Sequence, residues 1–265
     1  MACNDFSDDA GLIAQAFVSA RREARGLASY PSAIPPTLDA AYAVQDAAIA
    51  LDGTTIGGWK VGKIDPPLDG ANRLAGPIFM RHIVAQADTP VAMPVFADGF
   101  AAAEAEFLLR VGTPPPPGRK RFTTEEATAH IDMVHLGIEI ASSPLPTIND
   151  LGPTVTISDF GNNNGLVIGP AIADWRGADI ADWPVSLLIN GREAGAARAA
   201  EMLDGPFGAA RFLFELLADR GIAIERGSWI SSGAVTGVHP VAVGDSIEAR
   251  FDGDRVVRCA ITAAT

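Results

Sequence analysis

The sequence is poor in cysteine, in basic residues and in long apolar runs, and each shortage excludes a class of protein. Only two cysteines, Cys3 and Cys259, occur among 265 residues, so no disulfide framework is expected and a reducing cytoplasm suits the chain. No apolar run reaches the ~18 residues that span a bilayer. The first residues are acidic and lack the basic region of a secretory signal peptide. We therefore expect a cytoplasmic protein with no membrane partner.

Basic residues are outnumbered, because 20 Lys and Arg stand against 32 Asp and Glu and give a formal net charge of -12. Such a surface repels phosphate groups, so nucleic acid is not an expected partner. The sequence also lacks a Walker loop, a GxSxG elbow and a Gly-x-Gly-x-x-Gly turn, which leaves nucleotide binding and serine-hydrolase chemistry without support. The hydrophobic content of 48% is ample for the core of a globular protein.

Apolar periodicity predicts helices before residue 53 and mainly strands after residue 54. The first helix is expected over 10–27 with Asp8 or Asp9 as N-cap, and the second runs from a Thr37 cap to Gly53. Further helices are predicted at 124–134 and 206–220. Strands are predicted at 91–96, 100–111, 135–140, 166–168, 185–189, 229–232, 246–251 and 256–261. The stretch 142–164 is expected to be an irregular connection that covers a site.

Three glutamates lie in apolar surroundings, where a carboxylate faces a desolvation cost unless something neutralises it. Glu104 and Glu106 are two residues apart, and Glu139 lies in the separate segment Gly137-Ile-Glu-Ile. On a strand, residues i and i+2 share a face, so the first two carboxylates can converge with Glu139 from a second strand. Three oxygen ligands without Cys or His suit Mg²⁺ or Mn²⁺ rather than zinc. The Ala-rich stretch also permits a helix, on which the pair would diverge.

Lys60 and the asparagines at 162–164 are the next candidates for a site. Lys60 is flanked by glycines, which suggest that its backbone approaches something closely, although a surface lysine on a strand has the same pattern. Asn162 and Asn163 belong to Asp159-Phe-Gly-Asn-Asn-Asn-Gly, which is either a polar turn or a source of amide donors for a carboxylate.

Two segments near the C-terminus add possible ligand contacts. Ser232 and Gly233 follow a predicted strand, where backbone N–H groups can cradle an anion. The four histidines have no metal-site spacing, and His239 is a candidate because it lies in the loop after that strand. An anionic substrate would conflict with the net charge of the chain unless a bound divalent cation attracts it locally.

Together these segments resemble the fumarylacetoacetate hydrolase superfamily, and in particular its branch of 2-hydroxypenta-2,4-dienoate (2-keto-4-pentenoate) hydratases and 2-oxo-3-enedioate decarboxylases. The resemblance covers roughly residues 10–262. Its matching segments are, in order, Gly58-Trp-Lys-Val-Gly, Glu104-Ala-Glu, Gly137-Ile-Glu-Ile, Asp159-Phe-Gly-Asn-Asn-Asn-Gly, Ser232-Gly-Ala and Val243-Gly-Asp.

The resemblance implies an α+β fold with a mixed, mostly antiparallel β-roll core and flanking helices. Residues 1–53 would form an N-terminal helical segment and residues 54–265 the catalytic domain, and the protein would be a homo-oligomer. It also implies that Glu104, Glu106 and Glu139 bind Mg²⁺ or Mn²⁺, with Lys60 and Glu139 as catalytic residues. The expected contacts to a 2-keto acid substrate are Arg81, Asn162, Asn163, Ser232, Gly233 and His239.

The implied reaction is that of a metal-dependent hydratase, a lyase of aromatic-compound catabolism. It would add water to a 2-hydroxy-2,4-dienoate (2-keto-4-enoate) and give a 4-hydroxy-2-oxo acid. Decarboxylation of a 2-oxo-3-enedioate and C–C hydrolysis of an acylpyruvate pass through the same enolate and stay open. A non-catalytic partner subunit is the alternative outside enzymes.

Two positions depart from the pattern of the family. Arg81 stands near the place where hydratases usually carry an acidic residue, and it is a candidate to contact a second carboxylate. Phe160 stands where the family tends to have Asn, which favours a bulkier or more apolar substrate.

Overall fold

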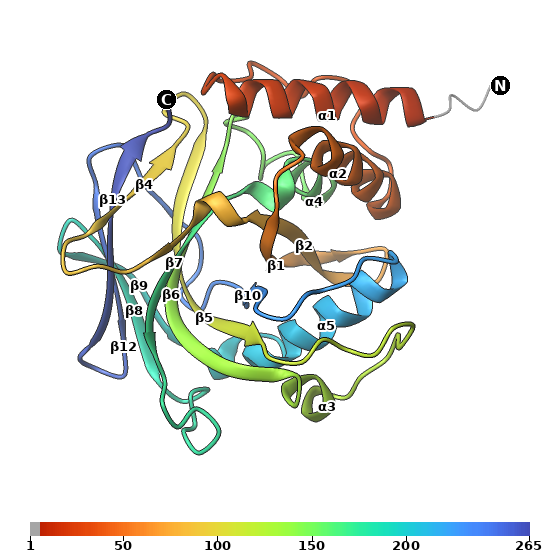
Figure 1. Ribbon diagram of the computed structural model, residues 1–265. Coiled ribbons are helices and arrows are strands. Elements are labelled where there is room, and N and C mark those ends of the chain that lie inside the picture. The colour runs from red at the N-terminus through yellow and green to blue at the C-terminus, as the bar shows by residue number, and fades with distance from the viewer. Residues whose placement is uncertain (1–5) are drawn as a thin grey trace.

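The computed structural model describes residues 6–265, and Cys3 lies outside this range. Two β-sheets and a set of helices make up the fold (Figure 1). The α-helices are α1 (Phe6–Arg22), α2 (Leu38–Asp52), α3 (Thr124–Thr128), α4 (Pro153–Ser158) and α5 (Gly205–Asp219). The strands are β1 (Ile56–Leu68), β2 (Ala71–Phe79), β3 (Ile83–Ala85), β4 (Val91–Val95), β5 (Phe100–Val111), β6 (Ile131–Ser143), β7 (Asn163–Ala171), β8 (Pro184–Ile189), β9 (Arg192–Arg198), β10 (Trp229–Ser231), β11 (His239–Pro240), β12 (Ser246–Phe251) and β13 (Arg255–Ala263).

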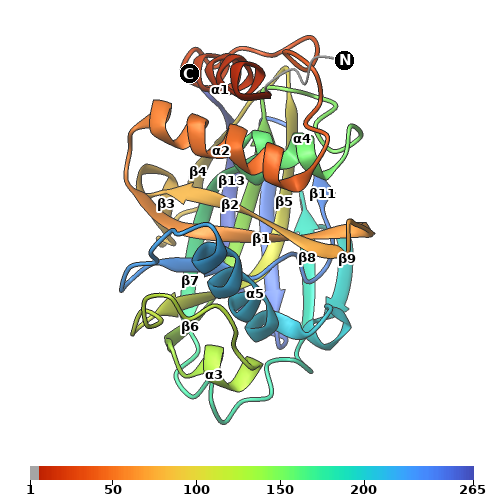
Figure 2. The ribbon, with the colours of Figure 1, turned by 90° about the vertical axis from the view of Figure 1, so that its right-hand side faces the viewer.

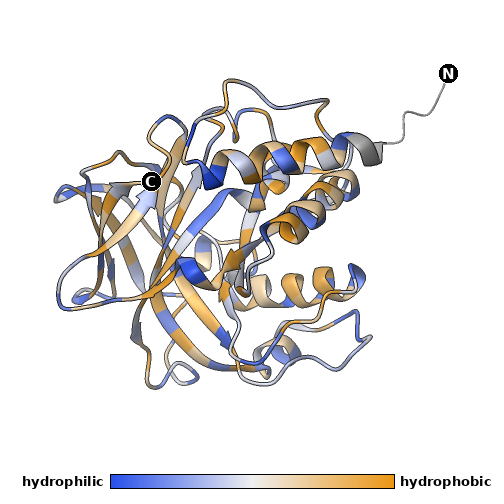
Figure 3. Cartoon of the chain, turned by 45° about the horizontal axis from the view of Figure 1, so that its top comes forward, coloured by the Kyte–Doolittle hydropathy of each residue, from blue (hydrophilic) through white to orange (hydrophobic). Residues whose placement is uncertain are grey.

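Strands β5 and β6 are the long, curved pair at the centre of the molecule (Figure 1). They pair antiparallel from Phe100 opposite Ser143 to Val111 opposite Ile131. Residues 102–109 of β5 are all buried, so both faces of this strand are covered. Figure 3 shows the hydrophobic colouring along these strands. Apolar burial on both sides fixes β5 as a strand and decides against the helix that its alanines permit.

The larger sheet has the strand order β2-β1-β10-β5-β6-β7-β3, with β11 paired to β5, and the smaller sheet has the order β4-β13-β12-β8-β9. Most neighbours are antiparallel. The two sheets meet where Phe107 of β5 packs edge-on against Phe251 of β12, with ring centroids 5.4 Å apart. Figure 2 shows α2 and α5 on opposite sides of β1. The predicted α+β class with a mixed, mostly antiparallel core is confirmed.

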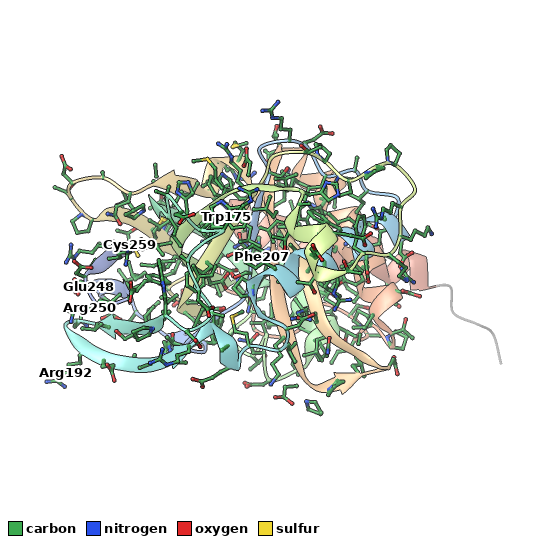
Figure 4. The ribbon with its side chains drawn as sticks, turned by 90° about the horizontal axis from the view of Figure 1, so that it is seen from below. Trp175, Arg192, Phe207, Glu248, Arg250 and Cys259 are labelled. Carbon is green, nitrogen blue, oxygen red and sulfur yellow. The ribbon has the colours of Figure 1, made fainter. Side chains whose placement is uncertain are left out.

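The smaller sheet carries charged side chains on one face and packs against the core with the other. Its residues Glu248, Arg250 and Cys259 are labelled in Figure 4. Glu248 accepts hydrogen bonds from Arg250 and Arg258 at 2.6 Å each. Cys259 on the neighbouring strand is fully buried against the core. Elsewhere, Trp175 stacks on Phe207 of α5 with ring centroids 5.5 Å apart, which fastens this helix to the 172–183 connection.

The N-terminal helices pack on α4 through a shared apolar cluster that includes Phe17, Val44 and Val155. Thr37 caps α2 by accepting a hydrogen bond from Ala40, and Gly53 ends it with φ 70°, both as predicted. The N-cap prediction for α1 is wrong, because the helix already begins at Phe6. Since α1 and α2 share this cluster with α4, a division of the chain at residue 53 stays a prediction. No helix within 6–265 has the length and apolarity to cross a bilayer.

Three sequence-based element predictions need correction. The helix expected over 124–134 ends at Thr128, because the chain enters the buried strand β6 at Ile131. The stretch 142–164 is not irregular: it contains α4, and Leu145 and Ile148 are fully buried. Strands β3, β9 and β11 were not predicted, and β1 and β2 were expected only as an undivided strand-rich region. Strand β3 pairs with β7 and strand β11 pairs with β5, and both partners are far away in the sequence.

Replacing Gly76 by alanine tests the close approach between β2 and the 160–162 turn. A Cβ atom at Gly76 would lie 2.0 Å from the backbone oxygen of Phe160, so the backbone must shift. We expect Gly76→Ala to lower the free energy of unfolding by about 1–3 kcal/mol, as overpacking does, measured by urea denaturation. The control is Gly11→Ala in α1, where no atom lies within 4 Å and where alanine favours the helix. Equal stability of Gly76→Ala and the wild type would contradict the packing of this turn.

Candidate active site

Glu104, Glu106 and Glu139 converge on one face of the larger sheet. Glu104 lies directly opposite Glu139 in the β5–β6 pairing, and Glu106 is two residues further along β5. Strand alternation turns all three to the same side. One ligand oxygen from each residue lies within 4.8 Å of the other two, and all three residues are buried. The predicted convergence of these carboxylates is therefore confirmed.

Two of the carboxylates each have one oxygen bound and one oxygen free. Glu106 Oε2 accepts hydrogen bonds from Ser231 Oγ at 2.5 Å and from the Gly233 backbone N–H at 2.9 Å. Glu139 Oε1 accepts a hydrogen bond from Asn163 Nδ2 at 2.9 Å. The other oxygens, Glu106 Oε1 and Glu139 Oε2, are buried without a partner among the described residues. A buried carboxylate oxygen without a partner is costly unless a cation binds it.

Lys60 is the cation nearest to this cluster. Strand β1 pairs with β10 so that Lys60 lies opposite Ser231, which brings the lysine to the side of the sheet that carries the glutamates. Its Nζ lies 3.3 Å from Glu139 Oε1 and 3.4 Å from Asn162 Oδ1. Burial opposes the charge of the ammonium, but Glu139, Glu104 and Glu106 outweigh it and raise the pKa of Lys60. Lys60 is 5% exposed, so the reading of a surface lysine is wrong.

Burial and the neighbouring negative charges also raise the pKa values of two of these carboxyl groups. Burial raises the pKa of Glu104 to about 7, with Lys60 opposing and Glu139 adding to the rise. Burial, followed by Glu139 and Glu104, raises the pKa of Glu106 well above its usual value. If all three carboxylates are ionised, the single ammonium of Lys60 leaves two negative charges unbalanced. A divalent cation has the charge that this cluster needs.

The residues present fit such a cation. The donors are all carboxylate oxygens, which suit Mg²⁺, Mn²⁺ or Ca²⁺ and not the softer metals that prefer Cys or His. Within the described chain this is the one cluster of three or more potential ligand residues. The free oxygens of Glu106 and Glu139, together with Glu104, would hold the ion.

A left-handed turn supplies the asparagines that border this cluster. Phe160, Gly161 and Asn162 have φ values of 55°, 63° and 57° in succession. The left-handed region costs about 1–2 kcal/mol for each residue with a side chain. The turn directs Asn162 to Lys60 and Asn163 to Glu139. Backbone strain that persists beside charged, buried groups is typical of a functional site.

A cavity of about 1000 Å³ opens from the carboxylate cluster. At its inner end lie Lys60, Glu104, Asn162 and Ser232. Ser232 is 2% exposed and its Oγ has no hydrogen-bond partner in the described chain, so it is free to meet a ligand. Further out, Met202, Leu203, Val238 and Arg73 line the wall. The cavity is large enough for a small organic acid.

The structure brings most, but not all, of the predicted contact residues to this cavity. The cavity is lined by Lys60, Asn162, Ser232 and Gly233. Asn163 does not line it but donates a hydrogen bond to Glu139. Arg81 does not reach it. Its guanidinium pairs with Asp52 and borders a separate cavity of about 350 Å³.

His239 is also outside the lining of the main cavity. Its Nε2 lies 3.0 Å from the Thr236 carbonyl oxygen, and its strand β11 pairs with β5 at Ala103. Neither Arg81 nor His239 therefore has the position that a contact to substrate in this cavity requires.

Three residues near the site gave no signal in the sequence. Arg73 of β2 lines the cavity and pairs with Asp204. Asn149 also lines the cavity and accepts a hydrogen bond from Asn162 Nδ2 at 3.0 Å. Arg21 of α1 binds Asp159, 138 residues away. Arg73 and Arg21 have their partners 131 and 138 residues away, and Asn149 has its partner 13 residues away across α4, so pattern and spacing do not indicate these contacts.

Comparison with known proteins gives a partial sequence match. No protein-family model matches the chain. A segment of 97 residues, 37% of this chain, is 31% identical to 4-oxalocrotonate decarboxylase of Pseudomonas sp. (strain CF600). The same length is 29% identical to 4-oxalocrotonate decarboxylase of Pseudomonas putida. The match spans only 37% of the length of these curated relatives.

The fold similarity extends over nearly the whole chain. The structure of 4-oxalocrotonate decarboxylase from Pseudomonas putida G7, complexed with magnesium and adipate, superposes with a TM-score of 0.79 and 22% identity, over 96% of this chain and 97% of that one. Fumarylpyruvate hydrolase from Pseudomonas aeruginosa, in complex with Mn²⁺ and pyruvate, has a TM-score of 0.59 and 14% identity, over 80% and 91%. The chain therefore shares its fold with these enzymes, and this is the fold that the resemblance to the fumarylacetoacetate hydrolase superfamily implied.

The raised pKa values make cation binding dependent on pH. Glu104, with a pKa of about 7, and Glu106, with a pKa well above its usual value, must release protons before they bind a metal. We expect the affinity for Mn²⁺ to rise at least about tenfold from pH 6 to pH 8, with release of protons. Calorimetric titration in buffers of different ionisation enthalpy measures both quantities. Affinity that is independent of pH, without proton release, would show that the apo carboxylates are already ionised.

Proposed function

We propose that this chain is a metal-dependent enzyme that decarboxylates a 2-oxo-3-enedioate or a close analogue. The observation that carries the proposal is the buried carboxylate cluster beside Lys60, in which Glu106 and Glu139 each have an oxygen without a partner in the described chain and Glu104 lines a cavity of about 1000 Å³. The partial sequence match to 4-oxalocrotonate decarboxylases supports it. Magnesium or manganese is the expected ion, because hard oxygen ligands select these cations.

The site divides the chemistry between the cation and the residues of the chain. A bound divalent cation would supply a Lewis acid that polarises the 2-oxo acid end of the substrate. In the reaction, the bond from C5 to the distal carboxylate breaks and carbon dioxide leaves. The electron pair moves through the conjugated chain to the C2 oxygen, which then takes up a proton. Lys60, whose Nζ lies 3.3 Å from Glu139, would donate a hydrogen bond to that oxygen and stabilise its negative charge.

Arg73 is the residue that favours a substrate with a second carboxylate. It lies opposite Lys63, three positions along the β1–β2 pairing from Lys60 opposite Gly76. At about 3.3 Å per residue the Arg73 backbone lies about 10 Å along the strand from the Lys60 position. Because three is an odd number of positions, strand alternation turns the Arg73 side chain to the face opposite Lys60, toward α5, where it pairs with Asp204 and lines the outer part of the cavity. Only Nη2 has a hydrogen-bond partner in the described chain, so the other donors can bind an anion.

Hydration of a 2-hydroxy-2,4-dienoate, the reaction expected from the sequence, is the second candidate. It uses the same cation and Lys60 but needs a water molecule directed to C4 and no second carboxylate. C–C hydrolysis of an acylpyruvate stays an alternative on the same chemistry. Assembly as a homo-oligomer and a cytoplasmic location stay predictions.

Turnover by the purified chain tests the proposed function. We expect release of carbon dioxide from 2-oxohex-3-enedioate that requires Mg²⁺ or Mn²⁺ and stops with chelator. Lys60→Ala should lower kcat/KM at least about 100-fold, the low end for a lost donor to a developing oxyanion. Hydration of 2-hydroxypenta-2,4-dienoate without decarboxylation would favour the second candidate. A chain that binds the cation but turns over neither compound would fit a non-catalytic partner subunit.

Substitution of Arg73 separates dicarboxylates from monocarboxylates. Because the guanidinium would meet only the distal carboxylate, Arg73→Gln should weaken the binding of 2-oxoadipate about tenfold or more, in the range for a lost charge-assisted contact. The binding of 2-oxobutanoate should stay unchanged, as calorimetry with Mn²⁺ present would show. Arg211→Gln is the matched control, since this arginine pairs with the same Asp204 but does not line the cavity. Equal losses for both ligands would exclude Arg73 as the distal contact.

A further inference from the structure

Arg21, near the C-terminus of α1, donates hydrogen bonds to residues on both sides of the left-handed turn 160–162. Its Nε and Nη2 donate to the two carboxylate oxygens of Asp159 at 2.5 and 2.9 Å, and Nη1 donates to Asn164 Oδ1 at 3.0 Å. Nη2 also donates to the Ser142 carbonyl oxygen at 3.0 Å. Asp159 is fully buried and the Arg21 side chain is 11% exposed. The planar guanidinium thus ties the residues before and after the turn to strand β6.

The same guanidinium also contacts the turn through aromatic rings. Its central carbon lies 5.2 Å from the ring centroid of Phe160 and 5.4 Å from that of Phe96. On its other side the turn rests on Gly76, where even a Cβ atom would collide with the Phe160 carbonyl. The turn is therefore held between α1 and β2. This enclosure explains how Phe160 and Asn162 keep an unfavourable backbone conformation.

The turn positions two asparagine side chains that contact Glu139 and Lys60. Asn163 donates a hydrogen bond to Oε1 of Glu139, and Oε2 has no partner among the described residues. Asn162 places an amide oxygen 3.4 Å from Lys60 Nζ and is itself bound to Asn149. If the turn relaxed to a right-handed conformation, both side chains would leave these partners. Groups that orient a metal ligand from behind commonly change metal affinity or activity 10–100-fold when they are removed.

We propose that Arg21 is a positioning residue, which holds the turn 160–162 in the conformation that presents Glu139 and Lys60 to the cation and substrate. Helix α1 then supports the site through Arg21, although it contributes no residue to the lining of the main cavity. The effect on turnover rests on the proposed function, whereas the effect on cation affinity does not.

The test compares Arg21→Ala with Arg22→Ala. Arg22 is adjacent on α1, but its Nη2 donates to the Leu51 carbonyl oxygen and not to the turn. We expect Arg21→Ala to weaken Mn²⁺ binding about 10–100-fold, the range for a lost orienting partner, and Arg22→Ala to bind like the wild type. Millimolar guanidinium should restore part of the affinity in Arg21→Ala, while ethylammonium, which lacks the fork, should restore less.

A combined variant shows whether Arg21 acts through the turn. If it does, adding Arg21→Ala to the pair Asn162→Ala and Asn163→Ala should weaken Mn²⁺ binding no further. Losses that add, or wild-type affinity in Arg21→Ala, would overturn the proposal. Should Arg21→Ala fail to fold, Asp159→Asn, which keeps the shape and removes the charge, takes its place with the same expectation. A wild type that binds Mn²⁺ but decarboxylates nothing would refute the proposed function and leave the assignment of Arg21 to be decided by affinity.

Discussion

Excess negative charge in the centre of the larger sheet is the constraint on which the rest of the site depends. Three carboxylates are buried within reach of one another, with the single ammonium of Lys60 to oppose them. Burying an ion costs several kcal/mol even after relaxation, and like charges directly opposite in a sheet repel. No packing of apolar neighbours removes this cost, so the arrangement is stable only when protons or a cation complete it.

The surrounding structure leaves one place for that cation. Ser231 and the Gly233 N–H occupy one oxygen of Glu106, and Asn163 occupies one oxygen of Glu139. Glu106 Oε1 and Glu139 Oε2 are left without partners among the described residues, and Glu104 beside them lines the cavity. The carboxylates are therefore oriented ligands rather than a loose acidic cluster. Lys60 beside them then suits an anion that arrives with its oxygens toward the cation.

Part of this site could be read from the sequence, because it depends on short-range geometry. The spacing of Glu104 and Glu106 predicts a shared face once β5 is a strand, and Glu139 on a second apolar strand completes the set. The glycines beside Lys60 indicated a close backbone approach, and the β1–β10 pairing at Gly58 shows it. The Ala-rich composition of β5 did not distinguish strand from helix, since a strand buried on both faces has no alternation.

The residues that the sequence did not reveal depend on contacts between distant segments. Arg21 looks like a surface arginine in the last turn of an amphipathic helix, yet its partner Asp159 lies 138 residues away. Arg73 is buried only because α5 brings Asp204 to it. Arg81 was assigned to the site from its place in the sequence, but the local turn at Met80–His82 directs it to Asp52. Such pairings follow from the tertiary fold, and composition and spacing do not encode them locally.

One diffraction measurement tests most directly whether the buried charge is a cation site. Crystals of the wild type grown with Mn²⁺ would be measured at a wavelength where manganese scatters anomalously. A single strong anomalous peak between Glu104, Glu106 and Glu139, at about 2.0–2.2 Å from one oxygen of each carboxylate, is the expected result. An empty cluster in crystals that hold Mn²⁺ elsewhere would mean that protons alone neutralise these carboxylates, and the metal-dependent chemistry would be wrong.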